Sequence, residues 1–178
     1  MIRQFSNISP TIADSAFIAE TAVVIGDVCI GENSSIWYNV VVRGDVNHIR
    51  IGDRTNIQDL SMLHVTGSRG AGDSGHPLII GNDVTVGHSV ILHGCTVEHG
   101  AFIGMHSMVM DRAVVGSGAV IAAGSLVPEG TVIPPLTLWM GSPAKLKRTI
   151  SAEEATRFSR ISKSYCSLAM SYISDNRQ

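Results

Sequence analysis

The chain has 178 residues, which is enough for one domain with its own hydrophobic core. Its 13 basic and 15 acidic residues are spread along the sequence and leave a formal charge of −2, which argues against a nucleic-acid partner. No apolar run approaches the roughly 20 residues that cross a membrane, and the first ten residues lack a secretory signal. Cys29, Cys95 and Cys166 are too scattered for a disulfide framework. We therefore expect a cytoplasmic protein with no nucleic-acid and no membrane partner.

Aliphatic residues recur at intervals of six along most of the chain. The series, with a slip of three before Ile51 and a slip of one before Val97, is Ile12, Ile18, Val24, Ile30, Ile36, Val42, Ile51, Ile57, Leu63, Ile80, Val86, Leu92, Val97, Ile103, Val109, Val115, Ile121 and Val127. Four residues after most of them lies a small or β-branched residue, and glycine directly follows many. This period predicts an all-β fold, a parallel β-helix of hexapeptides with three strands in each coil and the aliphatic side chains on the axis.

One insertion interrupts the repeat between Leu63 and Ile80, where 17 residues separate two axial positions that need six. The extra segment, "VTGSRGAGDSGHP", is rich in glycine and polar residues, so we expect a loop near 66–77 that protrudes from the coils. Pro134 and Pro135 end the coils, and we assign residues 1–150 to the β-helix.

The C-terminal segment 151–178 has the pattern of an α-helix. Ser151 and Glu154 have the spacing of a capping box at its start. A stripe of apolar residues at helical spacing predicts that the helix packs on the β-helix or on a neighbouring subunit. The stripe consists of Ala155, Phe158, Ile161, Tyr165, Leu168, Tyr172 and Ile173.

Two histidines are predicted to stack on adjacent coils. His64 directly follows the axial Leu63 and His93 directly follows the axial Leu92. With the insertion set aside, these positions are one coil apart, about 5 Å at the spacing of paired strands. Two neutral imidazoles placed in this way can bind one metal ion, at about 2.0–2.1 Å if it is zinc. His88 lies one hexapeptide earlier, on a different edge, and can join the same ion only if neighbouring subunits of a threefold-symmetric trimer share the site.

A single histidine on a solvated coil is more often an ordinary surface residue. Arg43, Gln58, His64 and His93 all occupy the position after an axial aliphatic, where small residues are the rule, and this grouping favours a site. The other histidines are not grouped with bulky polar residues in this way, and we expect no role for them in the site. They are His48, His76, His99 and His106.

The sequence resembles the γ-class carbonic anhydrase family. The matching segments run in the family's order across most of the chain: "VVRGDV" (41–46), "IGDRTNIQDLSMLHV" (51–65), "IGNDVTVGHSVILHGC" (80–95), "IGMHSMVMD" (103–111) and "GSPAK" (141–145). Hexapeptides alone are weakly specific. The set of Arg-Gly-Asp, Asn-x-Gln-Asp, a histidine five residues later and then His-x4-His is much more specific.

The resemblance implies a left-handed β-helix that forms a homotrimer with zinc or iron at each subunit interface. It implies the metal ligands His64, His88 and His93, and hydration of carbon dioxide to bicarbonate by a metal-bound hydroxide. It further implies that Gln58 orients the metal-bound water, that Asn56 lines the pocket, and that Arg43 forms interface ion pairs with Asp45 and Asp59. Tyr165 either approaches the site from the C-terminal helix or packs on the β-helix.

The chain departs from the family's pattern where that pattern places proton-shuttle glutamates. Val46 follows Asp45, and the loop offers Asp73 and His76 instead.

Three other functions stay open. A hexapeptide acyltransferase often has an ending such as "GSPAK", a thioester hydrolase would use the same hydroxide, and a metal-binding trimer without turnover would keep the ligands for assembly.

Overall fold

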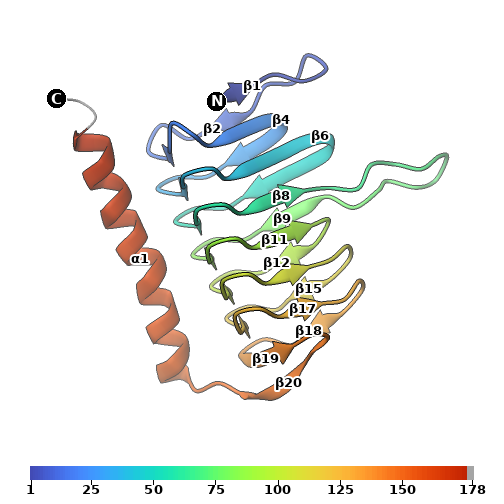
Figure 1. Ribbon diagram of the computed structural model, residues 1–178, viewed down its shortest axis with the longest axis vertical. Helices are drawn as coiled ribbons and strands as arrows, with labels where there is room; N and C mark the ends of the chain where they lie inside the picture. The colour runs from blue at the N-terminus through green and yellow to red at the C-terminus, as the bar shows by residue number, and fades with distance from the viewer. Residues whose placement is uncertain (176–178) are drawn as a thin grey trace.

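The computed structural model describes residues 1–175 of the chain. Short parallel strands wind in successive coils about one axis, and helix α1 (Ala152–Asp175) runs along the outside of the stack (Figure 1). The predicted parallel β-helix of hexapeptide repeats with a C-terminal helix is confirmed. Within the described residues, no helix is both long enough and apolar enough to span a membrane.

The coils form three faces, which we name the histidine face, the second face and the helix face. The histidine face contains β1 (Ile2–Arg3), β8 (Met62–His64), β11 (Ile91–His93), β14 (Met108–Val109) and β17 (Leu126–Val127). The second face contains β2 (Thr11–Ile12), β9 (Leu78–Ile80), β12 (Thr96–Val97), β15 (Val114–Val115) and β18 (Val132–Ile133). The helix face contains β3 (Phe17–Ile18), β5 (Ser35–Ile36), β7 (Asn56–Ile57), β10 (Thr85–Val86), β13 (Phe102–Ile103), β16 (Val120–Ile121), β19 (Thr137–Gly141) and the antiparallel β20 (Ala144–Thr149).

Two long strands, β4 (Val23–Ile30) and β6 (Val41–Ile51), turn the corner between the histidine face and the second face and join them into one 12-stranded sheet. Gly26 stacks on Gly44 at this corner, and a Cβ on Gly26 would lie 2.3 Å from the carbonyl oxygen of Gly44. Gly26 also has a φ of +77°, so the corner requires glycine there. The slip of three residues in the repeat falls here, and it places the Arg43–Asp45 segment beside the histidine face.

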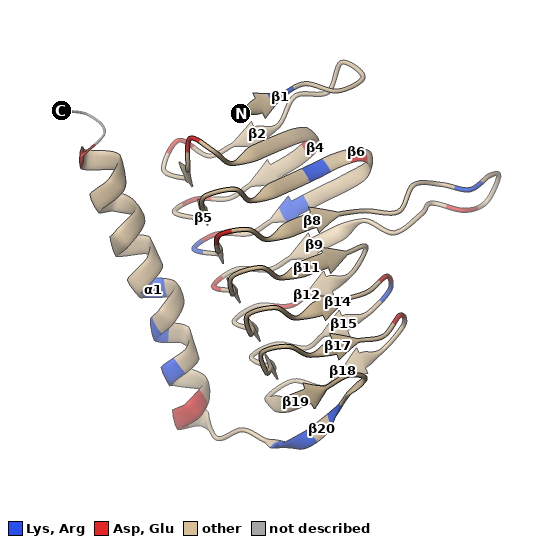
Figure 2. Cartoon of the chain, in the orientation of Figure 1, with Lys and Arg blue, Asp and Glu red and all other residues tan. Residues whose placement is uncertain are grey.

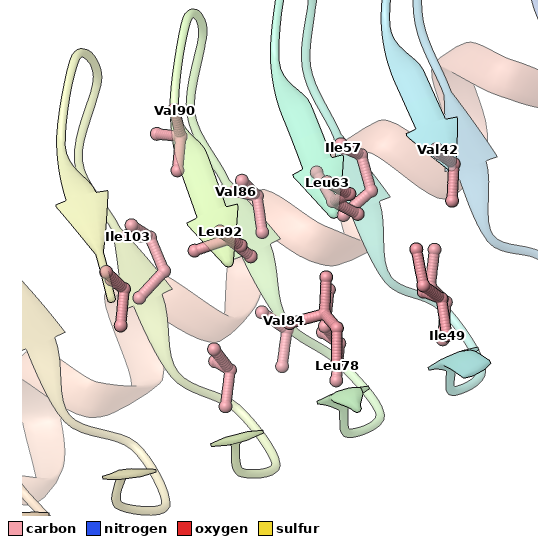
Figure 3. Packing of buried hydrophobic residues seen from close by; sticks show 14 of the residues in the cluster. Val42, Ile49, Ile57, Leu63, Leu78, Val84, Val86, Val90, Leu92 and Ile103 are labelled. Atoms are coloured by element: carbon pink, nitrogen blue, oxygen red, sulfur yellow. The ribbon is translucent and has the colours of Figure 1, made fainter. Parts of the chain in front are cut away.

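The axial aliphatic side chains fill the interior of the coils (Figure 3). Ile57, Leu63, Leu92 and Ile103 are completely buried, and each such side chain stabilises the fold by about 1.5–3 kcal/mol relative to exposure. Ile12 and Ile18 keep the axial register, since they pair with Ile30 and Ile36, but they are only partly buried. They lie in the first coils, where few further coils cover them.

Helix α1 begins with the predicted capping box, which is confirmed. The Glu154 backbone N–H donates to Ser151 Oγ (3.2 Å), and the Ser151 N–H donates to Glu154 Oε2 (3.0 Å). Charged residues lie mainly at the corners of the coils, at the tip of the 66–77 loop, on β6, on β20 and on the first half of α1 (Figure 2). The last residues of the predicted helical segment, 176–178, lie outside the described part of the chain.

The side of α1 that packs on the helix face differs from the predicted stripe at one position. Leu168 is 44% exposed, whereas Ser162 and Ala169 are buried against the coils. These two small residues let the helix axis approach the sheet closely. The larger rings of Tyr165 and Tyr172 then pack on Trp37, at centroid distances of 5.4 and 5.3 Å.

Candidate metal centre

His64 and His93 lie side by side on the histidine face. They are register partners at the ends of β8 and β11, as the repeat predicted. Nδ1 of His64 lies 3.1 Å from Nε2 of His93. Two nitrogen ligands of one tetrahedral zinc ion, each about 2.0–2.1 Å from the metal, lie roughly 3.3 Å apart. The spacing of the two nitrogens therefore fits two ligands of a single ion.

Each of the three predicted ligands also has an aspartate at its other ring nitrogen. Nε2 of His64 lies 3.1 Å from Asp45 Oδ1, and Nδ1 of His93 lies 2.6 Å from Asp111 Oδ1. Nδ1 of His88 lies 2.9 Å from Asp59 Oδ2. A carboxylate at one nitrogen of a neutral imidazole holds the proton there and leaves the lone pair of the other nitrogen for a metal.

With the protons held at the aspartates, the lone pairs of His64 Nδ1 and His93 Nε2 would face one another, and a cation between the two nitrogens would relieve their repulsion. Burial, together with the charge of Arg43 and of His93, lowers the pKa of His64, against the opposing effect of Asp45. A lower pKa favours the neutral imidazole, which is the form that binds metals. The residues present thus fit a zinc or iron ion.

His88 lies apart from this pair, at the corner that follows β10 on the helix face. Within residues 1–175 of one chain, no three His, Cys, Asp or Glu side chains gather in a group that could hold a metal ion. The spacing predicted this separation. A site that contains all three histidines therefore needs two chains, and the sharing between subunits stays a prediction.

His88 and Gln58 line a cavity of about 300 Å³ between the helix face and α1. Gln58 Nε2 donates to Asn56 Oδ1 (3.0 Å), and Asn56 Nδ2 donates to Thr85 Oγ1 (2.9 Å), so both amides are fixed in orientation. Both side chains are buried. Their predicted roles in orienting water and lining the pocket stay predictions. The structure places Gln58 with His88 in the lining of the cavity, whereas Asn56 is connected to it through Gln58.

Tyr165 occupies both of the places that the sequence left open. Its ring packs edge-on against Trp37, and the residue also lines the cavity that contains His88 and Gln58. Burial raises the pKa of Tyr165, and the charge of Asp59 raises it further. The phenol is therefore neutral and able to donate a hydrogen bond.

Of the two interface ion pairs predicted for Arg43, one occurs within the described residues of a single chain. Arg43 pairs with Asp45, which also contacts His64. Burial raises the pKa of Asp45, but the hydrogen bonds from Arg43 and His64 outweigh it and hold the pKa below its ordinary value. Asp59 lies beside His88 instead. A pair between Arg43 and Asp59 stays a prediction about neighbouring subunits.

Sequence reasoning missed one of the three aspartates that contact the histidines. Leu92 pairs with Val109, 17 residues later, because of the slip before Val97, so Met110 takes the place equivalent to His93 and Asp111 lies one position beyond it. The repeat therefore did not mark Asp111. Thr66 was also missed: its hydroxyl donates to Asp111 Oδ2 at 2.6 Å, and nothing in the repeat marks a residue of the inserted loop.

The two titratable residues noted in the loop have different positions. Asp73 accepts hydrogen bonds from the backbone N–H groups of Gly75 and Arg69, and these hold the pKa of Asp73 below its ordinary value. Asp73 is thus an ionised residue that stabilises the turn at the loop's tip. His76 lies at the base of the loop, where its backbone pairs with that of Thr66.

Comparisons with known proteins identify relatives of this chain. A family model described as "Bacterial transferase hexapeptide (six repeats)" matches residues 9–44 and 94–129. A carbonic anhydrase of Geobacillus kaustophilus is 48% identical over 165 residues, which cover 93% of this chain and 87% of that protein. The mitochondrial gamma carbonic anhydrase 1 of Arabidopsis thaliana is 46% identical over 94% of this chain, which spans only 61% of that relative's length.

Among solved structures, a hexapeptide transferase family protein from Anaplasma phagocytophilum superposes with a TM-score of 0.88 at 43% identity. The alignment covers 96% of this chain and 97% of that one. The repeat, the order of the matched segments and the high identity over nearly the whole length of the Geobacillus protein lead to one assignment. This chain belongs to the γ-class carbonic anhydrase family of hexapeptide-repeat proteins.

Proposed function

We propose that the protein hydrates carbon dioxide to bicarbonate at metal sites, each shared by two subunits of a homotrimer. The observation that carries the proposal is the set of three histidines, each with one ring nitrogen held by an aspartate. A histidine that serves only as a surface residue needs no such partner. Three of them, at the positions that match the family's ligands, support a metal centre.

Zinc or iron bound by three neutral imidazoles would keep its +2 charge and make a water molecule nucleophilic near neutral pH. The chain's own part is to hold the imidazoles, through Asp45, Asp59 and Asp111. The amide of Gln58, held in orientation by Asn56, would orient water and substrate in the cavity beside His88. Phe102 and Met105 give that cavity apolar walls, which suit a small apolar substrate.

The surface around His93 supports assembly. Ile91, Met108 and Met110 are 37–39% exposed, and with His93 and Asp111 they line a cavity of about 340 Å³. Apolar side chains gathered on a surface mark a place where another protein packs. In a closed threefold ring, the edge of one subunit that contains His88 faces the edge of the next that contains His64 and His93. The third ligand would then arrive with the neighbour.

The test is metal content together with stopped-flow hydration of carbon dioxide, on protein purified without chelators or an affinity tag that contains histidine. We expect about one zinc or iron ion per chain, as three imidazole ligands require, and loss of both metal and hydration in His93→Ala. His99→Ala is the matched control, because His99 lies on the second face, where its Nδ1 accepts the Asn82 N–H (2.9 Å).

Two results would contradict the proposal. Bound metal without hydration would favour thioester hydrolysis or a trimer that binds metal without turnover. Absence of metal, combined with release of free thiol from acetyl-CoA in the presence of an amine acceptor, would favour the acyl transfer that the names of some relatives suggest.

A further inference from the structure

The protruding loop is joined to the metal centre at its base. Thr66 and His76 pair through both backbone hydrogen bonds, at 3.0 and 2.8 Å. The amide of Asn47 then holds this base to the corner of β6, because Nδ2 donates to the carbonyl oxygens of Thr66 (3.0 Å) and Ser74 (2.8 Å). The loop therefore has a fixed root, and Thr66 is the residue of that root nearest in sequence to His64.

The side chain of Thr66 continues the connection inward. Its hydroxyl donates to Asp111 Oδ2 at 2.6 Å, while the other oxygen of the same carboxylate, Oδ1, lies 2.6 Å from Nδ1 of His93. A carboxylate held at both oxygens cannot rotate freely. The orientation of the His93 ring, and so the direction in which its Nε2 points, depends on the hydroxyl of Thr66.

The two aspartates that hold the stacked histidines differ in the group bound at their second oxygen. Asp45, which holds His64, has the guanidinium of Arg43 at its second oxygen, whereas Asp111 has a neutral hydroxyl. A carboxylate hydrogen-bonded to the other ring nitrogen makes a histidine a better metal ligand, and Asp111 has this position beside His93.

We propose that Thr66 is a positioning residue for His93, which acts through Asp111 and ties the root of the 66–77 loop to the affinity of the metal site. The proposal rests on the metal centre of the proposed function. It assigns to the loop a role in holding a ligand, separate from any role in proton transfer. Residues outside the ligand shell that hold a ligand in place change metal affinity by roughly 10- to 100-fold when they are removed.

The test compares zinc affinity, measured by competition with a chromophoric chelator, in the full-length protein and three variants. Thr66→Val keeps the shape and removes the hydroxyl, and we expect about tenfold weaker zinc binding. Thr66→Ser restores the donor and should return affinity to near the wild-type value. Thr21→Val is the matched control, because Thr21 also has a hydrogen-bonded hydroxyl, which accepts the Asn39 N–H (3.0 Å), but lies far from the histidines in the repeat.

A second readout uses cobalt, whose visible absorption reports the geometry of its ligands. We expect Thr66→Val to alter the Co²⁺ spectrum and Thr66→Ser to recover it. Unchanged zinc affinity in Thr66→Val, or failure of Thr66→Ser to recover it, would overturn the positioning role while leaving the metal centre intact. A wild-type protein that binds no zinc would overturn the metal centre, and the positioning role with it. Thermal melts and gel filtration of each variant show that the fold and the assembly are kept.

Discussion

The histidine face and the helix face are built from the same repeat, but the first is open and the second is covered by α1. On the histidine face, the apolar side chains of Ile91 and Met108 are exposed beside His93, and no element of the described chain covers them. On the helix face, α1 covers the coils, and the ring of Trp37 is 4% exposed under Tyr165 and Tyr172. The axis is packed alike under both. The repeat therefore determines the backbone, and the outward side chains determine what each face binds.

The residue after each axial aliphatic shows this difference most clearly. Along the histidine face, this position holds Arg43, His64, His93 and Met110 in successive coils. Along the helix face, it holds Trp37 and Gln58, then Gly87, Gly104 and Ala122. On the histidine face, Arg43, His64 and His93 form a row of bulky polar side chains that contains the two stacked candidate ligands. On the helix face, small residues in the later coils leave the cavity that α1 closes at one side.

The largest effect is expected when one metal ligand is removed from a subunit and is then supplied by a neighbouring subunit. His88→Ala and His93→Ala should each abolish metal binding and hydration. In trimers reassembled from equal amounts of the two variants, about one quarter of the interfaces combine an intact His93 with an intact His88, if subunits mix at random in a closed ring. Mixed protein should therefore recover about one quarter of the wild-type metal content and hydration rate.

The control for this experiment is each variant reassembled alone, which should recover nothing. A mixture that also stays inactive, although its subunits are shown by mass spectrometry to have exchanged, would mean that the neighbours do not share the site. Recovery in His88→Ala reassembled alone would indicate that two histidines are enough to hold the metal. Recovery well above one quarter with silent controls would indicate that mixed interfaces form preferentially.

The next largest effect is expected on the helix face. Trp37→Ala removes the ring between Phe17, Tyr165 and Tyr172, and large-to-small substitutions of this kind cost about 3–5 kcal/mol. Urea denaturation should show this loss in the free energy of unfolding. Leu168→Ala is the control. Its side chain is exposed, so its effect should stay within about 0.5 kcal/mol. A comparable loss in both variants would mean that α1 packs through the face that the sequence predicted.

Much of the fold and part of the site could be predicted from spacing. A strict period of six identifies the axial positions, and counting coils placed His64 beside His93 because paired strands keep register. Exposure of Leu168 could not be predicted, because a hydrophobic stripe does not tell which small residues, here Ser162 and Ala169, bring a helix close to a sheet. The contact of Thr66 could not be predicted, because an inserted loop follows no repeat. Its contact with Asp111 spans 45 residues and exists only in the folded chain.

The smallest effect concerns how the covering helix begins. Ser151→Ala removes one acceptor of the capping box and should lower the free energy of unfolding by about 1 kcal/mol.

Glu154, the other member, has its pKa lowered from 4.5 to about 2, first by the hydrogen bonds from Arg148 and then by the Ser151 N–H. A carboxylate whose pKa is lower in the folded state adds stability above its unfolded pKa, and that stability is lost as the pH falls from about 4.5 towards 2. Glu154→Gln keeps a side-chain oxygen but cannot ionise, so its stability deficit relative to wild type should shrink over this window. Urea melts at pH 6, 4 and 3 measure it, and a deficit that stays constant with pH would show that the pairing with Arg148 contributes nothing to holding α1 on the helix face.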